Sequence, residues 1–491
     1  ILKLTAEVHK PKIAVIDVYY IDKPLDSAWT YSYRHLFFDS YPLSFRKFEA
    51  VRATLPKGQW MEFMMPFSLY HSRWEELMTG TSARMIDCEP FMMGSEMRIA
   101  RGEPLPYTRT HEMTEGELPG MQALRNIAAY CRENGIEPVL CLEHWELPAA
   151  LYEKYDGYAS RHVVDLYARY AREAFRRYGD RVKTWFTFNE PMVIPELCFL
   201  NGFWWPKEHQ PARAFRWIHG KILCTARAVE IFRQELPEGK IGVIVNPPYI
   251  IPRDANNPAD AEAADVADNF YWRPFMDTAI LGRYPQKFLD ILQRENVMFD
   301  LTEEDKALIA KNTVDILGMN YYQPMRVKAK ETPWDDSQPF HPNKYFDNYD
   351  MPGKRMNPYR GWEIYPRSLY DIGMRIKREY HNIDWVVSES GMGVQNEEQY
   401  KNAEGIIQDT YRIEFIAEHL AWLSKAVAEG CNCHGYWLFA SIDNCSPYNT
   451  FKNRYGLVEV DRKQNLKRRL KASADWYCAA AESNSFDFKE I

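Results

Sequence analysis

Two glutamates in this chain stand where a pair of carboxylates could carry out acid–base or nucleophilic chemistry. Glu190 lies in the segment WFTFNEP, and Glu389 lies in VVSESG. Each closes a short β-favouring run and is followed within two residues by a proline or a glycine, which places it at a strand end. In barrel enzymes the loops at strand ends hold the reacting groups, and two carboxylates there suit the hydrolysis of a glycosidic bond.

The elements that must position these glutamates alternate along the chain. The runs predicted to be strands are residues 137–142, 181–188, 240–245, 314–319, 385–388 and 434–439. The runs predicted to be helices are residues 121–134, 162–178 and 261–281. Strands that alternate with helices predict a parallel sheet. A spacing of about 30 residues, with no GxGxxG segment after a first strand, favours a closed barrel over an open doubly wound sheet.

The predicted fold is therefore a (β/α)8 (TIM) barrel of the α/β class, with one catalytic domain over residues 1–491. Residues 323–360 are polar and contain several prolines. They are predicted to form a long loop at the C-terminal end of a strand, where barrel enzymes shape access to the site.

The motifs around the two glutamates resemble glycoside hydrolase family one. TFNEP resembles the acid/base motif of that family, and VSESG resembles its nucleophile motif, with Ser390 where an asparagine is usual. Other matching segments follow in the order of the family: EHW at 143–145, FMD and GRYP within 275–285, DILGMNYY at 315–322, GWEIYP at 361–366 and NRYGLV at 453–458. The resemblance extends over about residues 120–480.

The resemblance implies a retaining double displacement. Glu190 corresponds to the general acid/base and Glu389 to the nucleophile. The acid must keep its proton near neutral pH, which requires burial or a neighbouring negative charge to raise its pKa. Two carboxyl groups about 5–5.5 Å apart would give a covalent glycosyl-enzyme and net retention.

The same resemblance implies contacts to the sugar and to the nucleophile. Asn189 corresponds to the residue that hydrogen-bonds the sugar 2-hydroxyl, and His144, with Trp145 beside it, to the residue that binds the 3-hydroxyl. Tyr322 corresponds to the tyrosine that holds the nucleophile through its hydroxyl group.

The segment after the last predicted strand bears on the substrate. In ordinary β-glucosidases of the family it resembles WSLLDNFEW, whereas here it reads FASIDNCSP. Ser446 replaces a glutamate that takes the sugar 4- and 6-hydroxyls, which removes a charge that would repel a 6-phosphate. Phe439 replaces the tryptophan that forms the sugar platform, and Trp437 could compensate in part.

The 6-phospho-β-glycosidase branch carries serine, lysine and tyrosine in this region. The corresponding residues here are Ser446, Asn453 and Tyr455, with Lys452 next to the asparagine. Two substrates therefore stay open, a β-glucoside and its 6-phosphate. An alternative of another class is a catalytically impaired barrel that only binds sugar.

The first part of the chain, residues 1–110, does not carry the opening motifs of the family. Only Arg98-Ile99 and Gly102 resemble the second motif, and the arginine usual beside the nucleophile would fall near Phe91. Either this part has truly diverged, or its sequence reflects a shifted reading frame or a wrong assignment.

The charge of the chain gives no electrostatic footprint for nucleic acid. The 491 residues include 61 basic and 68 acidic side chains, for a net charge of −7. The basic run 467–471 is predicted to be a solvated helix face near the C-terminus, and a nucleic-acid patch is the alternative. No apolar stretch reaches the length of about 18 residues that a membrane span needs. The expected partner is a small-molecule carbohydrate, with neither nucleic acid nor membrane.

The cysteine and histidine patterns predict no metal and no cofactor. Nine cysteines are scattered, and Cys431, Cys433 and Cys445 lack the spacing of a zinc site. His111 opens a segment that resembles a zinc-protease motif, but Glu115 stands where a second histidine is required. The first residues lack the apolar region of a signal peptide, and free thiols suit a reducing compartment, so the cytoplasm is the expected location.

Overall fold

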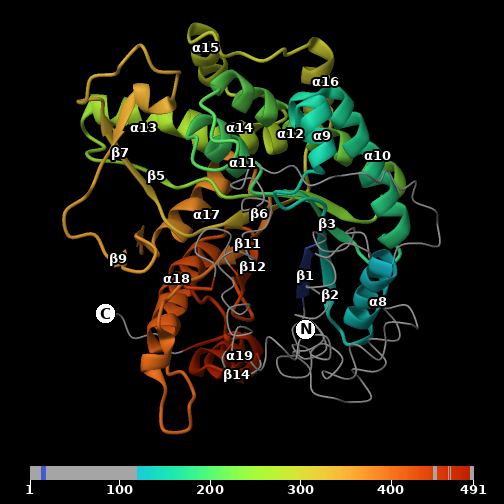
Figure 1. The fold of residues 1–491 in the computed structure, drawn as a ribbon, viewed down its shortest axis with the longest axis vertical. Coiled ribbons are helices and arrows are strands. Elements are labelled where there is room, and N and C mark those ends of the chain that lie inside the picture. Colours follow the sequence, from blue (N-terminus) through green and yellow to red (C-terminus); the bar gives the residue numbers. More distant parts are fainter. Residues whose placement is uncertain (1–12, 18–118, 446–450, 463, 465, 487–491) are drawn as a thin grey trace, which may run out of the picture.

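A curved sheet of parallel strands forms the centre of the molecule, and helices surround it (Figure 1). The computed structural model describes residues 13–17, 119–445, 451–462, 464 and 466–486. Within them, seven strands neighbour one another in the order β1-β2-β3-β4-β6-β11-β12, and every neighbouring pair is parallel. Their bounds are β1 Ile13–Asp17, β2 Glu137–Cys141, β3 Thr184–Asn189, β4 Lys240–Val245, β6 Ile316–Asn320, β11 Asp384–Ser390 and β12 Cys433–Leu438.

The helices lie between these strands in the chain. Their bounds are α8 Pro119–Glu133, α9 Ala149–Tyr155, α10 Arg161–Tyr178, α11 Val193–Pro195, α12 Pro211–Glu235, α13 Pro258–Tyr271, α14 Arg273–Met276, α15 Gln286–Arg294, α16 Glu303–Lys311, α17 Ser368–Glu379, α18 Thr410–Ala428 and α19 Ala472–Ser483. Shorter helical turns occupy Gly157–Ala159, Glu196–Leu200, Asp277–Leu281, Pro342–Lys344 and Glu397–Tyr400. Parallel strands in chain order, joined by helices, confirm the predicted (β/α)8 barrel, of which the structure describes seven strands.

The central strands β4 and β6 are buried because both faces of the sheet are covered there. Every residue of β6 is buried, and in β4 only Lys240 is exposed. Such near-continuous apolar runs are typical of parallel sheets, in which helices pack outside and side chains fill the barrel. The backbones of β4 and β6 come so close that a Cβ on Gly242 would lie 2.1 Å from the carbonyl oxygen of Ile316.

The predicted strands from residue 137 onward are confirmed with bounds that differ by at most three residues. The predicted helix over residues 261–281 is interrupted at Trp272. Pro274 explains the break, because it lacks a backbone N–H and its ring would clash with the carbonyl of Phe270 in a continuous helix.

The segment 323–360, predicted to be a loop, contains three short strands. β7 (Met325–Ala329) pairs in parallel with β5 (Ile250–Pro252) and antiparallel with β8 (Phe346–Asn348). Further along, β9 (Met356–Asn357) pairs with β10 (Trp362–Glu363). The prediction of an irregular loop was therefore incomplete, because backbone pairing with β5, about 75 residues away, is invisible to a local pattern.

The predicted helix face over residues 467–471 is wrong. Lys467–Leu470 forms strand β14, which pairs antiparallel with β13 (Val458–Asp461). Lys467 is exposed and the next three residues are partly buried, but Lys471 is wholly buried. Side chains alternate between the two sides of a strand. Lys471, directly after the strand, forms ion pairs with the buried carboxylates of Glu397 and Asp443, which the sequence pattern could not place beside it.

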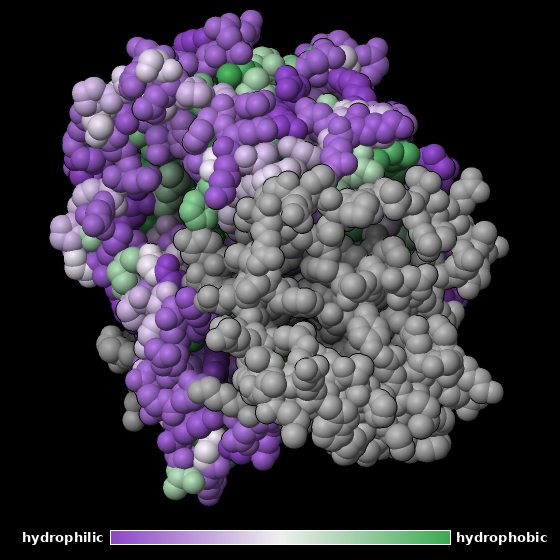
Figure 2. Space-filling model, in the orientation of Figure 1, coloured by the Kyte–Doolittle hydropathy of each residue, from purple (hydrophilic) through white to green (hydrophobic). Residues whose placement is uncertain are grey.

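Hydrophilic residues predominate on the described part of the face shown in Figure 2, where hydrophobic atoms gather in small separate patches. No helix within the described ranges is long and apolar enough to cross a membrane. The eight cysteines within those ranges are free thiols, and five of them are buried. The HEMTE segment and the N-terminal motif positions, Phe91 and Arg98 among them, lie outside the described residues.

Candidate active site

The two glutamates lie at the carboxyl ends of two barrel strands. Glu190 directly follows β3, and its backbone N–H donates to the carbonyl of Ile244 in β4 at 2.9 Å. Glu389 lies near the end of β11, where it is the register partner of Asn320 in β6. Both carboxylates therefore stand at the end of the barrel where the loops of a (β/α)8 enzyme form its active site.

Asn320 links the two strand ends. Its side-chain nitrogen donates to Glu190 Oε1 at 2.8 Å and to Asn189 Oδ1 at 3.1 Å. The hydroxyl of Ser388 donates to its oxygen at 2.7 Å and so fixes which way the amide faces. Asn320, which lies opposite Glu389 in the sheet, thus holds the Glu190 carboxyl.

Tyr322 holds the other carboxylate. Its hydroxyl donates to Glu389 Oε2 at 2.7 Å, the contact that the family resemblance implied. A hydrogen bond donated to a carboxylate favours its charged form. Glu389 is only partly buried, whereas Glu190 is 6% exposed. The two chemically identical groups therefore stand in different surroundings, as acid and nucleophile must.

The surroundings of Glu190 favour its protonated form. Burial first, and then the negative charge of Glu389, raise the pKa of Glu190 to about 8, against a smaller opposite effect of the bond from Asn320. At neutral pH this group therefore carries a proton that it can donate to a leaving oxygen.

We expect kcat/KM for an unphosphorylated aryl β-glucoside to fall about tenfold per pH unit above about pH 8, because kcat/KM follows the protonated acid of the free enzyme. Glu190 has a raised pKa, so its proton is present below that pH and lost above it. The measurement is a pH profile, repeated with Glu190→Gln on a substrate whose leaving group needs no acid. An alkaline limb that persists unchanged in this variant would assign the limb to another group.

Two residues after the barrel strands have unusual backbones. Glu190 has φ of 47°, and Trp145 has φ of 71°. Residues with side chains rarely adopt this left-handed region, at a cost of about 1–3 kcal/mol each, and such residues cluster at functional sites. His144, before Trp145, places Nε2 3.0 Å from the side-chain nitrogen of Asn189. The predicted sugar-binding pair thus lies beside the acid.

An aromatic wall continues from Tyr322, the residue that holds Glu389. The ring centroid of Tyr322 is 5.1 Å from that of Trp362 and 6.3 Å from that of Phe439. Phe439 in turn lies 5.4 Å from Tyr455, which is buried. Of the residues predicted for the sugar site, the structure therefore brings Tyr322, Phe439 and Tyr455 together.

The other predicted residues lie elsewhere or outside the described chain. Trp437 packs against an apolar cluster inside the barrel that includes Phe186 and Val386. Lys452 is exposed, and Ser446 is outside the described residues.

The motifs predicted no role for Asn320, Ser388 or Trp362, although all three lie in or beside matched segments. A signal existed for Asn320, which is the polar last residue of an otherwise apolar strand, and for Ser388, which follows the apolar run 385–387. Only the register between β6 and β11 shows that they contact each other.

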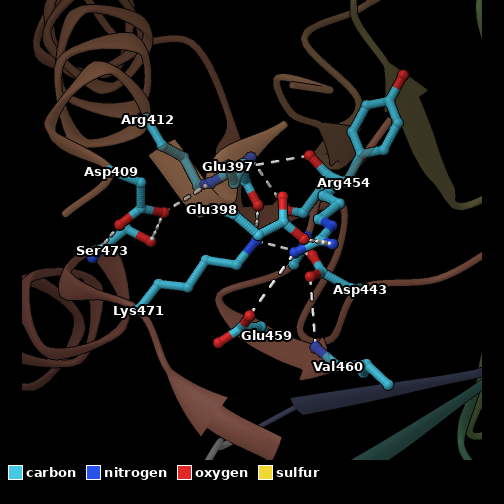
Figure 3. Close-up of polar contacts among 12 residues, drawn as sticks. Glu397, Glu398, Asp409, Arg412, Asp443, Arg454, Glu459, Val460, Lys471 and Ser473 are labelled. Carbon is cyan, nitrogen blue, oxygen red and sulfur yellow. Dashed lines mark hydrogen bonds and ion pairs between the residues drawn. The ribbon is translucent and has the colours of Figure 1, made fainter. Parts of the chain in front are cut away.

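A buried network of charged side chains holds the loop that carries Tyr455 (Figure 3). Lys471 Nζ lies 2.6 Å from Glu397 Oε2 and 2.8 Å from Asp443 Oδ1. Asp443 also accepts from the backbone N–H after Tyr455 at 2.9 Å, and Arg412 Nη1 donates to the carbonyl of Tyr455 at 3.2 Å. Buried charges that are paired in this way fix the conformation of the loop, because breaking one pair leaves an uncompensated charge.

No group of three or more histidine, cysteine or acidic side chains that could hold a metal ion occurs in the part of the chain that the structure describes.

Known proteins share this sequence and fold. The 6-phospho-beta-glucosidase GmuD of Bacillus subtilis (strain 168) is 46% identical over 353 residues, which are 72% of this chain and 76% of that protein. Beta-glucosidase A of Thermotoga maritima is 31% identical over 373 residues, covering 75% and 78% of the two chains.

Solved structures of the Thermotoga maritima family 1 β-glucosidase have the same architecture. One matches with a TM-score of 0.67 at 29% identity, over 75% of this chain and 78% of that one. Another, in complex with castanospermine, has a TM-score of 0.66 at 29% identity, over 75% and 79%. The model of glycosyl hydrolase family 1 matches residues 106–486, which leaves residues 1–105 unmatched. The chain belongs to glycosyl hydrolase family 1 and is a glycoside hydrolase.

Proposed function

We propose that this protein is a retaining β-glycosidase in which Glu190 is the general acid/base and Glu389 the nucleophile. The observation that carries the proposal is the pair of strand-end carboxyls, one buried with a pKa of about 8 and the other held by a tyrosine hydroxyl. This is the division of roles that a glycosidase needs.

The reaction proceeds in two displacements. Glu389 attacks the anomeric carbon while Glu190 protonates the departing glycosidic oxygen, so the bond to the aglycone breaks as the glycosyl-enzyme ester forms. Glu190, now ionised, removes a proton from water, which attacks the same carbon and releases Glu389. Asn189 and His144 bind hydroxyl groups of the sugar, and Tyr322 keeps the nucleophile in place. The separation of the carboxyls is predicted to be about 5–5.5 Å.

We further propose that the sugar carries a phosphate at O6. The relative with 46% identity is a 6-phospho-beta-glucosidase, whereas the β-glucosidases reported above are about 30% identical. Ser446 stands where a carboxylate would repel the phosphate, and Tyr455 matches the tyrosine of the phosphate-binding branch. A β-glucoside without a phosphate is the alternative substrate.

Wild-type enzyme is expected to show a kcat/KM about 100-fold or more higher for nitrophenyl β-glucoside 6-phosphate than for nitrophenyl β-glucoside, because charge-assisted contacts each contribute about 1.5–3 kcal/mol. Initial rates on both substrates give the ratio, and glucose 6-phosphate should compete. A ratio near one with no competition would leave the unphosphorylated β-glucoside as the substrate.

The second candidate is a barrel that binds sugar without cleaving it. The absence of the opening family motifs and the replacement of the platform tryptophan by Phe439 favour it. The same assay distinguishes this candidate from the enzyme. A protein that binds glucose or glucose 6-phosphate but releases no nitrophenol from either substrate at high concentration would support it.

We propose a small-molecule carbohydrate as the partner and the cytoplasm as the location. Free thiols at the described cysteines support a reducing compartment. We also propose that the whole chain folds as one catalytic domain.

A further inference from the structure

A phosphate beside Tyr455 needs a positive charge. The adjacent Arg454 is paired with Glu398 and Glu459, and the two positions before it do not place a charge in the site. Asn453, which takes the place of the lysine in the 6-phosphate branch, is neutral and wholly buried. Lys452 is exposed. A phosphate left without a cation in a partly buried cleft would be poorly compensated for the loss of water.

Arg360 brings a cation to Tyr455 from a different part of the chain. It lies in the turn between β9 and β10, which Asn357 ties to Gly393, the residue against which the ring of Tyr455 packs. Its Cζ atom lies 4.1 Å from the ring centroid of Trp362. Stacking on an aromatic face holds the plane of the guanidinium and leaves its N–H edges directed sideways.

Arg360 is close enough to the reacting groups to contact the sugar. Trp362, on which it stacks, is 5.1 Å from Tyr322, the residue that binds Glu389. Burial raises the pKa of Tyr455, Arg360 lowers it, and the charge of Glu389 raises it further. The ring of Phe439 lies 6.3 Å from that of Tyr322 and 5.4 Å from that of Tyr455, so Tyr455 and the residue that holds Glu389 line one site.

The position of Arg360 relative to Tyr455 is set by packing. The side chain of Asn357 in β9 donates to the carbonyl of Gly393 at 3.0 Å, which ties the β9–β10 turn to the segment after β11. The ring of Tyr455 lies against Gly393, where a Cβ would come within 2.5 Å of it. Arg412, which belongs to the buried network of Figure 3, donates to the backbone carbonyl of Tyr455.

We propose that Arg360, together with the Tyr455 hydroxyl, binds an anionic group on C6 of the sugar and so selects the phosphorylated substrate. The inference rests on the proposed function and names the cation that this function requires. A guanidinium suits the task, because its planar edge offers two parallel N–H donors to two phosphate oxygens. The residue is a specificity-determining one and takes no part in bond breaking.

The test compares kcat/KM on nitrophenyl β-glucoside 6-phosphate and on nitrophenyl β-glucoside. Arg360→Gln is expected to lower the ratio of the two values by about 10- to 100-fold, which corresponds to one lost charge-assisted contact. Arg360→Lys should recover part of the ratio, since it restores the charge without the planar edge. A matched control is Arg367→Gln, which removes an exposed arginine near another tryptophan, Trp422, and should leave the ratio unchanged.

An equal loss on both substrates in Arg360→Gln would overturn the inference, because a merely structural role of the arginine affects every sugar alike. A ratio that stays within about threefold of wild type would overturn it as well. Melting temperatures of the variants identify a fold defect.

If the proposed preference for a phosphorylated sugar is wrong, a different measurement tests Arg360. If wild-type enzyme does not prefer the phosphorylated substrate, inhibition of nitrophenyl β-glucoside hydrolysis by glucose 6-phosphate and by glucuronate still tests Arg360. Inhibition by either anion that Arg360→Gln relieves supports an anion site without a phosphorylated substrate, and no inhibition overturns the inference. Stronger inhibition by glucuronate than by glucose 6-phosphate would show that the site prefers a carboxylate. That result would overturn the proposal that Arg360 binds a 6-phosphate.

Discussion

Replacement of Glu389 by glutamine is expected to lower kcat by at least about 1000-fold, because a neutral amide cannot attack the anomeric carbon and covalent catalysis contributes several powers of ten. The change is isosteric, and the Tyr322 hydroxyl can still donate to the side-chain oxygen, so the fold should remain intact. The measurement is kcat on an aryl β-glucoside and its 6-phosphate, with the melting temperature recorded for both proteins.

The matched control is Glu196→Gln, since Glu196 is another glutamate whose pKa burial raises, to about 7, and it lies outside the proposed catalytic pair. This variant should keep most of its activity, which would show that burial and a raised pKa alone do not make a carboxyl essential. Activity of Glu389→Gln above about one hundredth of wild type would refute the nucleophile assignment.

Replacement of Glu190 by alanine should abolish most hydrolysis of substrates with poor leaving groups and should be rescued by azide on an activated aryl substrate. An activated leaving group departs without protonation, so the glycosyl-enzyme still forms. Its hydrolysis becomes slow because no base assists water, and azide, which needs no base, attacks in its place. We expect a rate increase of about tenfold or more and a β-glycosyl azide as the product.

The configuration of the azide product tests the mechanism separately from the rate. Two inversions at the anomeric carbon give the β-azide, whereas a single displacement would give the α-azide. An α-configured product would count against a retaining enzyme. Unchanged turnover of poor leaving groups, with no effect of azide, would remove Glu190 from the acid/base role.

The sequence by itself determined the six described barrel strands from residue 137 onward and the strand-end glutamates, whereas β1 was not predicted. A strand such as Lys240–Val245 reads as a continuous apolar run because both of its faces are covered, and this property is local to six residues. Motif order around Glu190 and Glu389 then gave the family, which the match over residues 106–486 confirms.

The sequence could not give the contacts that divide the work between the two glutamates. Asn320 stands 130 residues from Glu190 and bonds to it because their strands lie close together in the barrel. The different burial of Glu190 and Glu389, which decides which of them keeps a proton, likewise arises only when the surrounding side chains are packed.

The tertiary structure alone decided where the charges around the substrate lie. Lys452 is next in sequence to the expected lysine position and is exposed, whereas Arg360, about 95 residues from Tyr455, lies over Trp362 beside the tyrosine that holds Glu389. Lys471 looks like part of a solvated basic run and is buried between two carboxylates. Strands follow from short-range periodicity, but the neighbours of a long charged side chain depend on how distant segments pack, which no local pattern encodes.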